Sequence, residues 1–172
     1  MGNEQQFKES ETIWIPASEN DLSLKNISPP IIRQDGNKII LEAEDACIKG
    51  ASIVGHYVDF PSNFDGSIEW PFQINTSGLY LFSIKYSCGQ TLGEPSRSLK
   101  TSLDGHVHFE KLDFPRTLTW NDWNDTVFTL TLQPGLHSFK IETCGFNGPN
   151  IDSLTIHYAD PSPKSNSTKT TN

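Results

Sequence analysis

The chain has 172 residues, a formal net charge of −8 and a pI near 5.0. This excess of acidic residues argues against polyanionic partners, so we expect no binding to nucleic acid and no binding to an anionic membrane surface. Every apolar run is shorter than the roughly 20 residues that span a bilayer. The first residues have neither a basic n-region nor an apolar h-region, so no signal peptide is visible.

Composition along the chain predicts one folded domain with polar ends. Residues 1–37 are polar and predict an N-terminal extension or linker, and residues 160–172, DPSPKSNSTKTTN, predict a flexible tail. Residues 38–159 hold most of the 10 Phe, 4 Trp and 4 Tyr of the chain, enough large side chains for one core. The three cysteines, Cys47, Cys88 and Cys144, have no CxxC spacing, and we expect no essential disulfide and no thiolate zinc site.

Alternation of apolar and polar residues recurs inside this domain. It is clearest in residues 80–86, where Tyr, Phe, Ile and Tyr share one face, and in residues 127–132. The predicted strands are residues 38–44, 67–74, 80–86, 98–103, 107–112, 127–132, 137–141 and 151–158. Turn signals such as Asp104-Gly105 separate them, and no long helical pattern is present. The sequence therefore predicts an all-β, antiparallel β-sandwich of the jelly-roll type.

Two short motifs carry acidic and amide groups. In Glu42-Ala43-Glu44 the two carboxylates share one face if the segment is a strand, and such a pair suits a calcium ion. A solvated strand face explains the same spacing. In Gly148-Pro149-Asn150-Ile151-Asp152 the tight turn places Asn150 and Asp152 on one face of the last strand, which is also typical of an ordinary turn.

A third motif carries two large rings. Trp120 and Trp123 lie in a polar loop and are separated by two residues. An exposed indole ring can stack on the apolar face of a sugar, because leaving such a ring in water has a cost that a ligand relieves. The alternative is that both rings pack inward and cover the end of the sandwich.

Seven strings together resemble the carbohydrate-binding modules of family 35, which are close to family 6. They are LEAEDA, GASIVGHYVDF, SGLYLFSIKYSCG, SRSLKTSLDG, LDFPRTLTWNDW, LQPGLHSFKIE and GPNIDSLTI, in the order and spacing of that family. The resemblance covers residues 39–157. It implies a galactose-binding-like β-sandwich that is not an enzyme, is secreted, is appended to a polysaccharide-degrading enzyme, and holds a structural calcium ion.

The resemblance also implies site residues. The calcium ligands of the family fall on Glu42, Glu44 and Asp152, and its sugar-binding residues fall on Tyr57, Trp120 and Asn150. Trp123 matches a position that packs more often than it binds. The expected ligand is a plant or microbial polysaccharide or its chain end, bound by a lectin-like monomer outside the cell.

Two departures from the family concern the loops. His56 stands where the family often has Gly, and the loop that begins at Cys88 and contains Glu94 is longer than usual. Arg97 occupies a position that is often basic, where it can meet a uronate or pair with a neighbouring carboxylate.

Other functional classes fit the sequence less well. No GxSxG string supports a hydrolase triad, and the carboxylate pair that a glycosidase needs is the one assigned to calcium. A structural or protein-interaction domain that has lost its sugar remains the alternative, since fold does not fix function.

Overall fold

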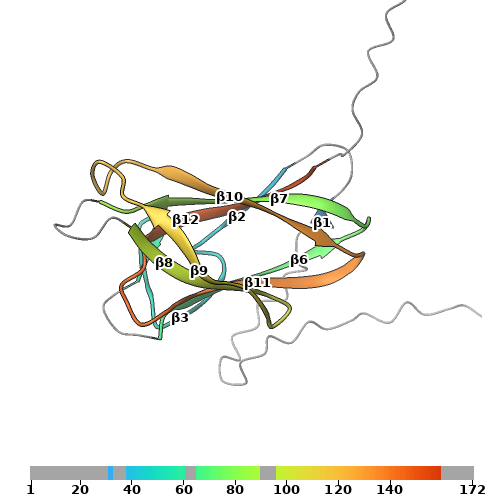
Figure 1. Ribbon diagram of the computed structural model, residues 1–172, viewed down its shortest axis with the longest axis horizontal. Helices are drawn as coiled ribbons and strands as arrows, with labels where there is room; N and C mark the ends of the chain where they lie inside the picture. Colours follow the sequence, from blue (N-terminus) through green and yellow to red (C-terminus); the bar gives the residue numbers. More distant parts are fainter. Residues whose placement is uncertain (1–30, 33–37, 61–64, 90–95, 160–172) are drawn as a thin grey trace, which may run out of the picture.

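The computed structural model describes residues 31–32, 38–60, 65–89 and 96–159. In this part of the chain twelve strands form two six-stranded sheets that pack face to face (Figure 1). The predicted all-β sandwich is confirmed, and all strand pairs are antiparallel except β1 with β6. Most of the predicted N-terminal extension and the whole predicted tail lie outside the described residues. No helix of the described residues is long and apolar enough to cross a membrane.

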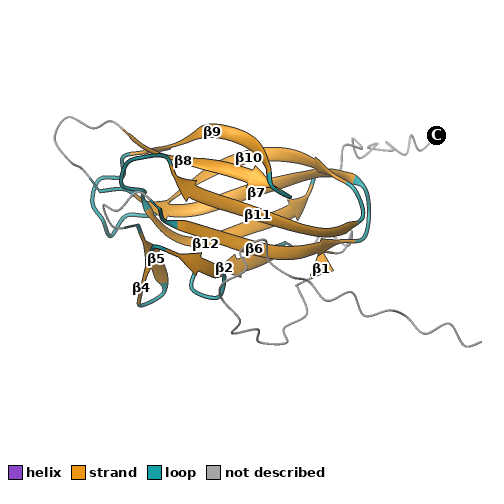
Figure 2. Ribbon diagram, turned by 90° about the horizontal axis from the view of Figure 1, so that it is seen from below, coloured by secondary structure: helices purple, strands orange, loops and turns teal. Residues whose placement is uncertain are grey.

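The first sheet has the order β1-β6-β11-β8-β9, with β3 also paired to β6. Its strands are β1 (Ile31–Ile32), β3 (Cys47–Lys49), β6 (Ser67–Ile74), β8 (Ser96–Leu103), β9 (His106–Pro115) and β11 (Gly135–Thr143). Figure 2 shows the outer face of this sheet, with β9, β8, β11 and β6 side by side.

The second sheet has the order β10-β7-β12-β5-β4, with β2 also paired to β12. Its strands are β2 (Ile39–Glu42), β4 (Ser52–Val54), β5 (Tyr57–Asp59), β7 (Gly78–Ser87), β10 (Asn124–Leu132) and β12 (Asn150–Tyr158). The end of β7 and the connections β9–β10 and β11–β12 gather at one end of the sandwich, at the left in Figure 1. This end brings together segments that are far apart in the sequence.

The eight predicted strands are all present, and β6 has the predicted bounds. Most of the others run a few residues longer than predicted because strand pairing continues beyond the apolar stretch. The first predicted strand is the exception, since β2 ends at Glu42 and not at residue 44. The very short strands β1, β3, β4 and β5 were not predicted.

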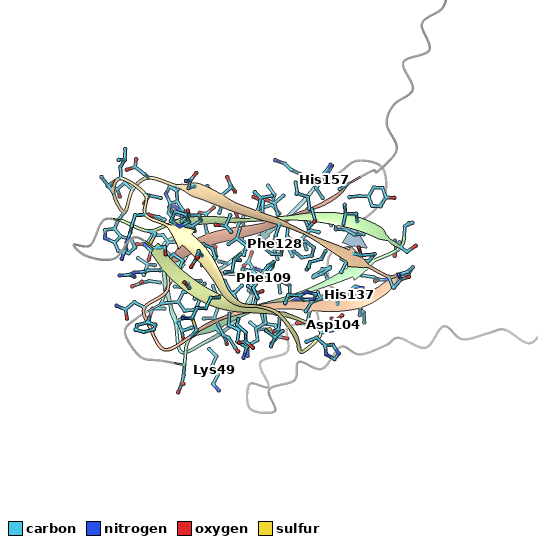
Figure 3. The ribbon with its side chains drawn as sticks, viewed as in Figure 1. Lys49, Asp104, Phe109, Phe128, His137 and His157 are labelled. Carbon is cyan, nitrogen blue, oxygen red and sulfur yellow. The ribbon has the colours of Figure 1, made fainter. Side chains whose placement is uncertain are left out.

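The core is built from aromatic residues of both sheets. Phe139 of β11 contacts Trp70 of the same sheet, at 6.4 Å between ring centroids, and Phe82 of the opposite sheet, at 5.3 Å. Fully burying a residue of this kind contributes roughly 1.5–3 kcal/mol. Where the edges of the sheets meet, Phe109 of β9 and Phe128 of β10 pack at 5.4 Å and close one side of the sandwich (Figure 3).

The turn between β8 and β9 is the predicted Asp-Gly turn. Asp104 and Gly105 have φ of 51° and 77°, and positive φ at both central positions is what a type I′ hairpin turn requires. The Asp104 carboxylate accepts a hydrogen bond from the backbone N–H of Ser138 at 2.8 Å and lies 2.7 Å from Nδ1 of His137 (Figure 3). The turn is therefore anchored to the neighbouring strand β11.

The three cysteines carry thiols. Cys88 and Cys144 lie in separate places and bond to different groups: Arg116 donates to the sulfur of Cys88 at 3.2 Å, and the thiol of Cys144 donates to the carbonyl of Ser98 at 3.3 Å. Burial raises the pKa of the Cys88 thiol, although the nearby arginines oppose this.

Paired charges occupy the outer face of the first sheet. Glu142 of β11 lies 2.7 Å from the ammonium of Lys100 and 2.5 Å from that of Lys140. Partial burial by itself raises the pKa of Glu142, but the bonds from the two lysines outweigh burial and lower the pKa. A carboxyl whose pKa is lower in the folded chain than in the unfolded chain stabilises the fold above the unfolded value, and this stability is lost as the pH falls through the folded pKa.

The pairing of Glu142 predicts a pH-dependent stability. We expect Glu142→Gln to lower the free energy of unfolding at pH 7 by about 0.2–1 kcal/mol, the range of solvent-exposed ion pairs. The difference from wild type should shrink as the pH falls below 4.5, the ordinary value of the Glu142 carboxyl. Urea denaturation at pH 7, 5 and 3 measures it, and an unchanged difference at all three pH values would contradict the ion-pair account.

Candidate functional site

The loop end of the second sheet is held by hydrogen bonds between β7 and the β9–β10 connection. The backbone N–H of Thr117 donates to the carbonyl of Cys88 at 2.9 Å, and the Thr117 hydroxyl accepts from the N–H of Cys88 at 3.1 Å. The hydroxyl of Ser87 donates to the carbonyl of Trp120 at 2.7 Å. The connection that carries both tryptophans is therefore fixed to the end of β7.

A compact turn sets the directions of the two tryptophans. The Asp122 carboxylate accepts hydrogen bonds from the N–H of Thr119 at 2.7 Å and from the Thr119 hydroxyl at 2.8 Å, and the same hydroxyl accepts from the N–H of Asn121 at 3.1 Å. An acidic or hydroxyl side chain that bonds nearby backbone N–H groups stabilises such turns. The turn sends the rings of Trp120 and Trp123 to different neighbours.

Trp120 lies on the side of Gly89 and Arg97. The ring fits against Gly89 so closely that a Cβ at that position would come within 2.5 Å of it. The Arg97 guanidinium lies 5.0 Å from the ring centroid and donates to the carbonyl of Gly148 at 2.7 Å. Trp120 is nevertheless 39% exposed, which makes it the one tryptophan among the exposed large apolar residues of the described chain. Its ring is thus supported and partly open to water.

Tyr57 and Trp123 form a separate ring cluster with His56. The ring centroids of Tyr57 and Trp123 are 5.7 Å apart, and His56 lies 5.8 Å from Tyr57 and 6.2 Å from Trp123. Tyr57 and Trp123 are half-buried and His56 is exposed. The ring contacts of the described residues therefore join Tyr57 to Trp123, whereas the family resemblance implies Tyr57 and Trp120 as the sugar-binding rings.

Asn150 begins β12 beside the end of β7. It is paired with Ser87 in the sheet register and is 7% exposed. The Gly148 backbone before it packs on the core, because a Cβ there would come within 2.9 Å of Phe60 and 3.0 Å of Leu99. Ser87 also bonds the carbonyl of Trp120, so Asn150 and Trp120 are attached to the same residue of β7.

Two of the predicted carboxylates, Glu42 and Glu44, stand where β2 ends. Glu42 is the last residue of the strand and is exposed, and Ala43 is fully buried with its N–H bonded to the carbonyl of Asp152 at 2.9 Å. Glu44 falls in the following turn. The predicted strand is therefore shorter than expected, because it ends at Glu42 and does not extend to Glu44.

Asp152 lies at a β-bulge of β12. The pairing with β7 shifts between Ile151 and Ser153, so Asp152 has no partner residue on β7. A bulge changes the direction of a side chain and increases local twist. Here the Asp152 carboxylate lies 3.0 Å from Nζ of Lys85 and 4.0 Å from Nε2 of His56. β2 and β12 are neighbours, as the calcium prediction requires, with Glu42 paired to Ser153.

The acidic groups around Asp152 repel one another. Partial desolvation and the carboxylates of Asp152 and Glu44 raise the pKa of Glu42, and Lys85 opposes this. One oxygen of Glu44, Oε2, is buried and has no hydrogen-bond partner among the described residues. Among all the residues that the structure describes, no three side chains of His, Cys, Asp or Glu are close enough to hold a metal ion together. The three carboxylates are thus electrostatically coupled without forming one compact cluster.

The sequence motifs did not predict that Lys85 forms an ion pair with Asp152. Nothing in the alternation of β7 distinguishes it from any outward lysine, since the bulge that brings Asp152 to it is not visible in the sequence. Its ammonium also lies 5.5 Å from the centroid of the Trp123 ring. Glu94 lies outside the described residues.

No family model matches the chain. Over 124 residues it is 28% identical to an exo-β-D-glucosaminidase of Amycolatopsis orientalis, and over 130 residues it is 25% identical to an isomaltosyltransferase of Sporosarcina globispora. The matches cover 67% and 70% of this chain. The chain spans 12% and 11% of the length of these two relatives.

The fold is similar to that of a solved family 35 carbohydrate-binding module of Clostridium thermocellum. The TM-score is 0.64 at 27% identity, and the match covers 72% of this chain and 99% of the module. The resemblance to family 35 that the sequence predicts is thereby confirmed.

The contacts of Trp123 predict a packing role. We expect Trp123→Ala to lower the free energy of unfolding by about 1–3 kcal/mol, less than for a fully buried ring because Trp123 is half-buried. Trp120→Ala is the matched control and should change stability less. Urea denaturation measures both, and a Trp123→Ala protein as stable as wild type would rule out the packing role.

Proposed function

We propose that this chain, whose described domain has the fold of the family 35 carbohydrate-binding modules, is a non-catalytic module that binds a plant or microbial polysaccharide or its chain end. The observation that carries the proposal is the Trp120 ring, which is 39% exposed although its loop is fixed to β7 by hydrogen bonds. A rigid, partly open indole ring is suited to stacking on the apolar face of a sugar ring.

Asn150 supports a binding site at the same place. Its amide offers both donors and an acceptor, which match the vicinal hydroxyls of a sugar. Because Asn150 is almost buried and is held in β12, it loses little conformational entropy when the ligand arrives. Aromatic stacking contributes ~1–3 kcal/mol per ring for nucleic-acid bases. A similar value for sugars, with a few hydrogen bonds, gives dissociation constants roughly in the micromolar to millimolar range.

Tyr57 is the third residue of the proposed sugar site. Its ring is held by Trp123 at 5.7 Å and by His56, so it is an ordered apolar surface near the loop end. In this arrangement Trp123 positions Tyr57, and Trp120 contributes the larger open ring. Arg97, which supports Trp120, adds a positive charge to the site.

We further propose that Glu42, Glu44 and Asp152 hold a structural calcium ion. All three offer oxygen ligands, which calcium prefers, and the buried Oε2 of Glu44 has no other hydrogen-bond partner among the described residues. The repulsion that raises the pKa of Glu42 is the kind that a divalent cation relieves. Bound calcium would supply charge neutralisation and would tie the turn after β2 to β12.

The module is proposed to act as part of a larger secreted enzyme. Both relatives are about eight to nine times longer than the matched segment, and both are named as enzymes that act on sugars. A catalytic domain elsewhere in such a protein would be the functional partner, and the module itself is proposed to be monomeric. A structural or protein-interaction domain is the alternative, and a sugar titration distinguishes the two.

Removal of calcium should destabilise the domain. A ligand that binds only the native state adds RT ln(1 + [L]/Kd), about 3 kcal/mol at a concentration of 100 Kd. We therefore expect EDTA to lower the melting temperature by several degrees and added calcium, but not magnesium, to restore it. A melt that is unchanged by EDTA and by calcium would exclude the calcium site.

Sugar binding should depend on Trp120 more than on Trp123. A panel of polymers of glucose, glucosamine, mannose, xylose and uronic acids, with and without EDTA, first identifies a ligand. Trp120→Ala should then abolish binding in calorimetry while its calcium-dependent melt stays nearly intact. Unchanged affinity of Trp120→Ala would overturn the assignment. If Trp123→Ala abolishes binding and keeps the fold, the binding ring is Trp123.

Asn150 should contribute through hydrogen bonds. We expect Asn150→Ala to weaken binding by about 1–3 kcal/mol, the usual cost of leaving polar partners unsatisfied. Asn121→Ala, in the exposed loop beside Trp120, is the matched control and should bind as wild type does. Calorimetry on the same ligand compares the two, and equal affinities for Asn150→Ala and wild type would remove Asn150 from the site.

A further inference from the structure

Phe146, in the connection between β11 and β12, has a ring that is open to water. It is 70% exposed, whereas Trp120 is 39% exposed. Six of the nine large apolar residues that are exposed in the described chain lie on strands. The other three, Leu118, Trp120 and Phe146, lie in the connections β9–β10 and β11–β12, at the same end of the sandwich (Figure 1). The open ring of Phe146 therefore belongs to the end that carries the proposed sugar site.

The backbone on both sides of Phe146 is held to the first strands of the sandwich. Before it, the thiol of Cys144 donates to a carbonyl of β8 at 3.3 Å. After it, the carbonyl of Gly148 accepts a hydrogen bond from Arg97 at 2.7 Å, and Gly148 itself is buried. Between them, Gly145 has a φ of 88°, a left-handed conformation that glycine adopts without strain. Phe146 thus stands at the tip of a turn that is attached at both ends, and its ring is exposed there although the loop is not loose.

Arg97 connects this turn to the ring of Trp120. Its guanidinium lies 5.0 Å from the Trp120 ring centroid while it donates to the carbonyl of Gly148. Phe146 comes two residues before Gly148, and two residues of chain span at most about 7 Å. The two exposed rings are therefore neighbours of one guanidinium. Polar groups accompany them, because Asn147 directly follows Phe146 in the turn.

We propose that Phe146 is a second stacking surface of the sugar site, which makes the ligand a chain of at least two sugar units. One unit stacks on Trp120 and a later unit of the same chain stacks on Phe146. The proposal rests on the proposed function. Separate rings with amide and guanidinium groups beside them suit a saccharide chain, in which apolar ring faces and hydroxyl groups recur together. A protein partner is matched better by one continuous apolar centre with a polar rim.

Calorimetry with oligosaccharides of increasing length tests the proposal. The probes are oligosaccharides of one to six units from the polymer of the panel that binds wild type. Affinity of wild type should rise with length by roughly five- to 150-fold over the shortest oligosaccharide that binds, the effect of one more stacked ring at ~1–3 kcal/mol. Phe146→Ala should lose this rise and bind the shortest oligosaccharide as wild type does. Phe146→Trp keeps a ring and should keep the rise.

Val127→Ala is the matched control, because Val127 is 53% exposed on β10 and lies outside the connections. It should bind every oligosaccharide as wild type does. Both alanine variants should melt as wild type does, since surface substitutions change stability little. A rise with length in Phe146→Ala equal to that of wild type, or no rise in wild type, overturns the proposal and leaves sugar binding at Trp120 standing. If wild type binds no sugar of the panel, the proposed function and this inference are both refuted.

A second measurement reports on the Phe146 ring itself. The ten phenylalanines are labelled with ¹⁹F, and the Phe146 resonance is assigned by its absence in Phe146→Leu. The longer oligosaccharides should shift this resonance, and the shortest one that binds should not, because it reaches Trp120 alone. The resonance of Phe139, which is fully buried in the core, should stay in place with all of them. A Phe146 resonance that does not move when the longest bound oligosaccharide saturates the protein overturns the proposal.

Discussion

The β-bulge at Asp152 is the constraint on which the proposed site depends. Because the pairing of β12 with β7 shifts there, Asp152 turns toward Lys85 while Ile151 and Leu154 remain fully buried in the core. A regular strand would alternate, and could not give Asp152 this direction and keep both apolar neighbours inside. The bulge thereby allows one strand to serve the core, the acidic group near β2 and, through Asn150, the loop end.

The division of the two tryptophans follows from a second local feature, the turn closed by Asp122. It sends Trp120 toward Gly89 and Arg97 and Trp123 toward Tyr57 and Lys85. The ring of Trp120 is then partly open to water, while the ring of Trp123 contacts Tyr57 and the Lys85 ammonium. β7 connects the Trp120 loop with the acidic residues near Asp152, because it carries both Ser87, which bonds the carbonyl of Trp120, and Lys85, which pairs with Asp152.

Much of this architecture can be predicted from sequence, and the misses have physical reasons. Alternation located strands such as Ser67–Ile74 because each buries one face. The three-residue strands β3, β4 and β5 are too short to show a period. Which ring Tyr57 meets, and that Lys85 faces Asp152, depend on a turn and a bulge that join distant segments, so no local pattern contains them. The likeness to family 35 modules supplied the residues, and the structure supplied their neighbours.

The central claim, that the domain binds sugar at the loop end, is tested most directly by nuclear magnetic resonance on the wild-type domain. The four tryptophans, Trp14, Trp70, Trp120 and Trp123, give separate indole N–H signals, and asparagine side chains give amide signals. On titration with a polysaccharide that binds, the indole signal of Trp120 and the amide signals of Asn150 should shift most, while Trp70 in the core stays fixed. Shifts confined to the outer face of the first sheet, around Lys100 and Glu142, or no shifts with any polymer of the panel, would contradict it.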